Sequence, residues 1–85
     1  METDETRLKR LKLRSWRRGT KEMDMILGGF ADTQLESLSA EALDAHEALM
    51  AEADQELYAW ISGQAPVPDR HQEAIARLRE NLTHN

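Results

Sequence analysis

The chain has 85 residues and no cysteine, which suits one small domain and excludes disulfide bonds and thiolate chemistry. Its hydrophobic content of 40% and charged content of 32% are typical of a globular protein rather than a disordered one. The three histidines, His46, His71 and His84, lack the spacing of metal ligands, so we expect no metal site.

Charge is distributed unevenly along the chain. Eight of the eleven Lys and Arg residues lie between Arg7 and Lys21, whereas residues 22–69 hold eleven acidic residues and no Lys or Arg. A basic segment before an acidic body is typical of a nucleic-acid-binding end or of a charged face for a protein partner. No apolar run reaches 18 residues and no secretory signal is recognisable, so we expect a cytoplasmic protein without membrane insertion.

Two helical patterns occupy the first part of the chain. The first covers residues 5–18, and the second covers residues 21–34. The apolar positions of the first are Leu8, Leu11, Leu13 and Trp16, and those of the second are Met23, Ile26, Leu27 and Phe30. Gly28 and Gly29 fall inside the second pattern, either ending that helix early or letting a neighbouring helix approach closely. We favour close packing because Phe30 keeps the register.

Three further helices are predicted after residue 38. One begins with Ser39 as its N-cap. Its inward-facing stripe consists of Leu43, His46, Leu49, Met50 and Ala53. The next has Asp54 as its N-cap and ends at Gly63. The last starts from the capping-box spacing of Asp69 and Gln72 and ends near Leu82.

No segment shows the alternation of a strand, so the predicted fold is all-α, a small bundle of about five short helices. We expect residues 1–85 to form a single domain and a monomer, with frayed ends at residues 1–4 and 83–85.

The joint between the first two helices, residues 17–24, is where the charge changes sign. Gly19 suits a helix-ending position because it reaches positive φ without a Cβ clash. Thr20 is a good N-cap for the next helix, and Glu22 falls in the first turn, where the helix dipole favours an anion. A tight helix–helix joint accounts for this pattern, but not for the opposite charges of Arg18 and Glu22 beside it.

Catalytic patterns are weak in this sequence. His46 beside Glu47 and Asp69 near His71 are the two histidine–carboxylate neighbours, and neither is accompanied by a nucleophile. We therefore interpret His46 as a packed core histidine and expect no enzymatic activity.

Two sequence blocks carry a resemblance to a known family. The first is RRGTKEMD (residues 17–24), followed by Ile26, Leu27 and Phe30, and the second is DQELYAWISG (residues 54–63) with a proline after it. Together they resemble the succinate dehydrogenase assembly factors that promote flavin attachment, over residues 11–68. The fold of that family is a small five-helix bundle, in agreement with the periodicity.

The resemblance implies a function. Such factors bind the flavoprotein subunit of succinate dehydrogenase, and in bacteria the related fumarate reductase, and assist the covalent linkage of FAD to a histidine of that subunit. They act on the FAD of the partner and hold no cofactor stably themselves. The contact residues of the family correspond to Arg18, Gly19 and Glu22, and we add their neighbours Arg17 and Asp24 to the predicted partner-binding site.

A second hypothesis is a small nucleic-acid-binding regulator that uses the basic first helix. The residues that could neutralise phosphates are Arg7, Lys9, Arg10, Lys12, Arg14, Arg17 and Arg18. The acidic net charge of −5 and the lack of a recognition-helix pattern argue against it.

Overall fold

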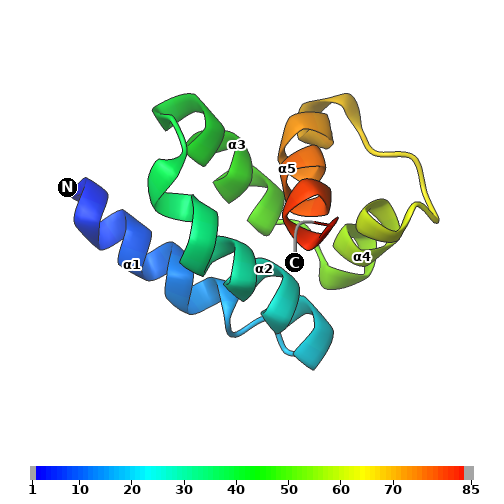
Figure 1. Cartoon of the computed structure of the whole chain (residues 1–85), viewed down its shortest axis with the longest axis horizontal. Helices are drawn as coiled ribbons and strands as arrows, with labels where there is room; N and C mark the ends of the chain where they lie inside the picture. The colour runs from blue at the N-terminus through cyan, green and yellow to red at the C-terminus, as the bar shows by residue number, and fades with distance from the viewer. Residues whose placement is uncertain (1, 84–85) are drawn as a thin grey trace. The chain divides into compact units, whose positions relative to one another are not determined.

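The computed structural model describes residues 2–83, and within this range it contains helices and no strand (Figure 1). The α-helices are α1 (Asp4–Ser15), α2 (Lys21–Gln34), α3 (Ala40–Met50), α4 (Asp54–Ser62) and α5 (Gln72–Thr83). Two short 3-10 helices, η1 (Leu35–Ser37) and η2 (Asp69–His71), precede α3 and α5. The prediction of an all-α fold with five short helices is confirmed.

The chain divides into two compact units, residues 1–38 and residues 39–85. The prediction that residues 1–85 form a single domain stays a prediction. Helix α1 begins at Asp4 with Thr3 as its N-cap, and α5 includes Thr83, so both helices enter the segments that we expected to fray. Residues 1, 84 and 85, where the remainder of that expectation falls, lie outside the described residues.

In the first unit, α1 and α2 pack against each other (Figure 1). Their apolar faces and that of η1 supply the buried side chains of Leu11, Met23, Leu27, Phe30, Ala31 and Leu35. The hydroxyl oxygen of Thr20 accepts the Met23 N–H at 3.3 Å, which confirms Thr20 as the N-cap of α2. Helix α2 continues through Gly28 and Gly29 to Gln34, as the register of Phe30 predicted.

Helix α1 ends three residues earlier than predicted, at Ser15 rather than Arg18. The buried Ser15 hydroxyl donates to the Leu11 carbonyl at 2.7 Å, one turn back along α1, so this buried hydroxyl has a partner within the last turn of the helix. Residues 16–20 therefore form the connection to α2, and Gly19 lies within this connection rather than directly at the end of the helix.

In the second unit, α3 and α4 each pack against α5. The buried apolar side chains are Ala42, Leu49, Met50, Leu57, Trp60, Ala74, Ile75 and Leu78. Ser39 caps α3 by accepting the Ala42 N–H at 3.1 Å, as predicted. Gly63 ends α4 in the left-handed conformation, with φ of 84°, which is also as predicted.

Three predictions of local structure in this unit are wrong. Ala53, which was predicted to face inward, is exposed. It occupies the N-cap position of α4, so Asp54 is the first helical residue and not the predicted cap. Asp69 begins η2 rather than capping α5, because the His71 N–H bonds to the Pro68 carbonyl at 2.9 Å and tightens the first turn. The Gln72 amide still donates to Asp69, at 3.3 Å.

The His46 side chain is buried within the second unit, which confirms its interpretation as a packed histidine. Burial, and secondarily the positive charge of Arg77, lowers the pKa of His46 from 6.5 to about 4. Between about pH 4 and pH 6.5, therefore, this imidazole is neutral in the folded protein but protonated in the unfolded chain.

This difference predicts how stability depends on pH. Because the unfolded chain gains a proton near pH 6.5 and the folded protein only near pH 4, the free energy of unfolding falls as the pH drops. We expect a loss of about 2 kcal/mol between pH 7 and pH 5 from this group. Urea unfolding at each pH measures it, with His46→Gln as the control that removes the titration. An equal pH dependence in the variant would contradict the assignment.

Candidate functional site

The joint between α1 and α2 is built around Gly19, whose φ of 105° lies in the region that side chains rarely adopt. The space around this residue is open, because a Cβ placed on it would meet no atom within 4 Å. Glycine is therefore required by the backbone conformation and not by packing inside the molecule. Thr20 then returns to extended backbone and caps α2.

Asp24 ties the two ends of the joint together. Its carboxylate oxygen Oδ1 accepts the backbone N–H of Arg18 at 2.5 Å, while its own N–H bonds to the Thr20 carbonyl at 2.9 Å. A hydrogen bond to a charged acceptor is worth more than a neutral one, typically about 1.5–3 kcal/mol. The side chain of Asp24 thus fixes the position of the Arg18 backbone relative to the first turn of α2.

The joint gathers all five residues of the predicted partner-binding site within one short segment. Arg17, Gly19 and Glu22 are exposed, whereas Arg18 and Asp24 are half-buried. Glu22 is the second residue of α2, where the positive end of the helix dipole favours its charge. The segment therefore presents guanidinium donors and a carboxylate acceptor on either side of a backbone stretch that carries no side chain at Gly19.

The indole of Trp16 lies beside this joint and covers Gly28 of α2. A Cβ added to Gly28 would overlap the indole ring, whereas one added to Gly29 would meet no atom within 4 Å. The indole Nε1–H donates to the Asp32 carboxylate at 3.3 Å, and 42% of the Trp16 residue stays exposed. The prediction that the glycine pair permits close packing is thus confirmed for Gly28, and it is a side chain of the preceding connection that makes the approach.

The basic residues of α1 have acidic neighbours that the sequence does not reveal. Arg10 binds the Glu2 carboxylate with two hydrogen bonds of 2.7 and 2.9 Å, and Lys12 pairs with Glu36 of η1 at 2.9 Å. The Arg10 hydrogen bonds and the positive charges nearby lower the pKa of Glu2, although burial opposes this shift. Part of the positive charge on α1 is therefore offset inside the first unit.

The second unit contains a histidine–carboxylate pair that sequence analysis missed. His71 Nε2 lies 2.6 Å from Glu52 Oε2, and Arg70 Nη2 lies 3.0 Å from the same oxygen. Hydrogen bonds from His71 and Arg70 lower the pKa of Glu52. The His71 ring also packs beside Trp60, with centroids 5.4 Å apart. Because only 3% of the His71 side chain is exposed, we interpret this pair as a clamp between the α3–α4 turn and η2.

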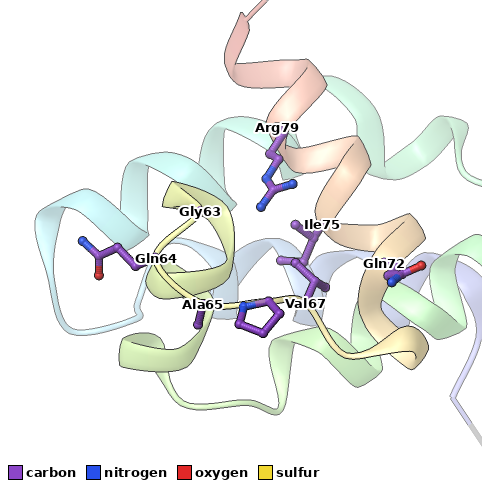
Figure 2. Close-up of a pocket in the computed structure, with 8 residues that line it drawn as sticks. Gly63, Gln64, Ala65, Val67, Gln72, Ile75 and Arg79 are labelled. Carbon is purple, nitrogen blue, oxygen red and sulfur yellow. The ribbon is translucent and has the colours of Figure 1, made fainter.

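A hollow of about 580 Å³ lies between the segment 63–67 and α5 (Figure 2). Arg79 points from α5 toward this segment and donates to the carbonyls of Trp60 and Ile61 at the end of α4. A cation at a helix C-terminus stabilises the carbonyls of the last turn, so the guanidinium has a structural role. Within residues 2–83, no group of three or more potential ligands could hold a metal ion, and no helix is long and apolar enough to cross a membrane.

Comparison with known proteins shows a family match over most of the chain. Residues 9–82 match the family model described as the flavinator of succinate dehydrogenase. The FAD assembly factor SdhE of Acetobacter pasteurianus is 37% identical over 86% of this chain and 65% of its own length. The mitochondrial succinate dehydrogenase assembly factor 2 of Candida glabrata is 37% identical over 84% of this chain and 50% of its own length.

The corresponding protein of Meyerozyma guilliermondii is 38% identical over 86% of this chain and 56% of its own length. The chain thus spans half to about two thirds of the length of these curated relatives. No solved structure matches the chain significantly.

We expect substitution by alanine to have opposite effects on stability at the two neighbouring glycines of α2. Gly29→Ala should raise the free energy of unfolding by roughly 0.5–1 kcal/mol, because alanine is the better helix former and its Cβ meets open space. Gly28→Ala should be less stable than Gly29→Ala by roughly 2 kcal/mol, because its Cβ displaces the Trp16 indole. Denaturant midpoints of the two variants measure the difference, and equal midpoints would show that the indole does not pack on Gly28.

Proposed function

The chain belongs to the family described as the flavinator of succinate dehydrogenase, and from this membership we propose that it is an assembly factor for that enzyme. It binds the flavoprotein subunit of succinate dehydrogenase and promotes the covalent attachment of FAD to it. The observation that carries this proposal is the match to the family model over residues 9–82, which covers both helical units.

The proposed role is that of a chaperone rather than a catalyst. When the factor binds one conformation of the flavoprotein more tightly than the others, the population of that conformation rises. The size of the rise is set by the difference in affinity between the conformations. If that conformation holds FAD beside the histidine that receives it, bond formation needs no catalytic group from the factor. The FAD remains that of the partner, and the factor itself binds no cofactor stably.

The proposed docking site is the joint, with Arg17, Arg18, Gly19, Glu22 and Asp24 as its residues. The open space around Gly19 permits a partner to approach the backbone closely. The Arg18 guanidinium supplies a fork of donors and the Glu22 carboxylate supplies an acceptor, a pairing that gives orientation as well as affinity. Asp24 holds the Arg18 backbone in place, so that the site is formed before the partner arrives.

We further propose that the factor acts as a monomer in the cytoplasm, and the match to an FAD assembly factor of a bacterium, Acetobacter pasteurianus, supports this location. The nucleic-acid hypothesis receives no support from the relatives that the chain matches. The pairing of Arg10 with Glu2 and of Lys12 with Glu36 also reduces the charge that α1 could offer to phosphates.

Substitutions at the joint test the proposal. Glu22→Ala and Arg18→Ala should each lower covalent flavin attachment by roughly tenfold or more, because each removes a charge-assisted contact to the partner. Both variants should keep their helicity and a near-normal unfolding midpoint, as exposed or half-buried surface changes usually do. The measurement is flavin fluorescence of the denatured flavoprotein subunit from a host that lacks its own factor.

Glu41→Ala is the matched control for Glu22→Ala. Each glutamate is exposed and is the second residue of a helix that follows a hydroxyl N-cap, Thr20 in one case and Ser39 in the other. The two substitutions therefore remove the same interaction with a helix dipole. Full flavin attachment with Glu22→Ala and Arg18→Ala would show that the joint is not the working surface.

A further inference from the structure

The exposed side of α2 continues the joint along the helix. Glu22, Met25 and Gly29 follow one another at spacings of three and four residues, which places them on one face. Over the seven residues from Glu22 to Gly29 the helix rises by about 10 Å. Met25 is 58% exposed, the largest exposed fraction among the large hydrophobic residues of the described chain.

Gly29 has no structural reason to be a glycine within the described molecule. It sits inside a regular helix, where glycine costs roughly 1 kcal/mol relative to alanine, and a Cβ there would meet nothing within 4 Å. Its conformation is helical, so no positive φ requires it. A helix position kept free of a side chain at the surface permits another molecule to approach the backbone closely.

Trp16 borders the same face through its packing on Gly28. The hydrogen bond to Asp32 and the contact with Gly28 fix the indole, yet 42% of the residue remains accessible. Aromatic residues and methionine are enriched at the centres of protein interfaces, where a fixed aromatic ring loses little entropy on binding. We call the surface formed by Trp16, Met25 and Gly29 the α2 patch.

The size of a stable interface connects the α2 patch with the proposed docking site. Specific complexes bury about 800 Å² on each partner, contributed by about 20–30 residues, which is far more than five residues at a joint can supply. The interface must therefore extend from the joint over neighbouring surface. Among the described residues of the first unit, the exposed large hydrophobic ones are Leu13, Trp16 and Met25, and all of them belong to α1, α2 or the connection between them.

We propose that the α2 patch is the apolar half of the surface that docks the flavoprotein, adjoining the charged half at Arg18 and Glu22. This inference rests on the proposed function. The segment of the partner that it fits carries an apolar side chain to pack on Trp16 and Met25, and it lies against the bare backbone at Gly29. The charged half orients the partner, and the apolar half supplies the area removed from water.

Gly29→Gln separates binding from folding. Glutamine is a better helix former than glycine and has room at this position, so the variant should be at least as stable as the wild type. Its side chain would keep the partner from the backbone, and we expect the Kd for the purified, FAD-free flavoprotein subunit to rise on the order of tenfold. Met25→Gln, which keeps the helix, should also weaken binding.

Leu82→Gln is the matched control, since Leu82 is a 41% exposed leucine on α5, outside the patch. Suppose that Gly29→Gln and Met25→Gln bind the flavoprotein with wild-type affinity while Glu22→Ala binds it poorly. This result would overturn the proposed role of the α2 patch and leave the proposed function intact. Failure of the wild type to bind the flavoprotein would overturn both. If Gly29→Gln altered self-association in sedimentation but not flavoprotein binding, the occupant would be a second copy of the chain and the inference would be wrong.

Discussion

The hydrogen bond from the Arg18 amide to the Asp24 carboxylate is the constraint on which the first unit depends. It crosses Gly19, whose positive φ sends the chain from the end of α1 into the start of α2. The Thr20 cap and the Asp24 bond together leave the connection little freedom, because each fixes one end of the turn. With the connection held in this way, Trp16 lies on Gly28 and the apolar faces of α1 and α2 meet.

A fixed joint suits a protein whose task is to recognise another protein. Affinity is lost when a binding surface must be ordered at the moment of association, so a preformed site retains more of its interaction energy. The joint carries charge of both signs beside an unobstructed backbone, which favours orientation of the partner. The histidine–carboxylate pair of His71 and Glu52 stands in contrast, since the His71 side chain is buried and the pair joins two turns of the second unit.

The parts of this site that depend on local chemistry could be predicted from the sequence. The positive φ of Gly19 and the N-cap role of Thr20 were predicted and are confirmed, although Gly19 lies within the connection and not at the end of α1. The acceptor role of Asp24 and the packing of Trp16 on Gly28 were not predicted, because each joins residues from different elements through geometry that periodicity does not contain. The spacing from Arg18 to Asp24, six residues across a glycine turn, is the signal that could have suggested the acceptor role of Asp24. The early end of α1 at Ser15 was missed for a similar reason, since a serine hydroxyl bonding back to a carbonyl follows no apolar pattern.

The claim that a preformed joint does the binding is tested most directly by the affinity of Asp24 variants for the flavoprotein subunit. Asp24→Ala keeps Arg18 and Glu22 but removes the acceptor for the Arg18 amide, whereas Asp24→Asn keeps an acceptor oxygen at the same place. We predict that Asp24→Ala binds the flavoprotein roughly tenfold more weakly and that Asp24→Asn binds nearly as well as the wild type. Equal, wild-type affinities for both variants would contradict it.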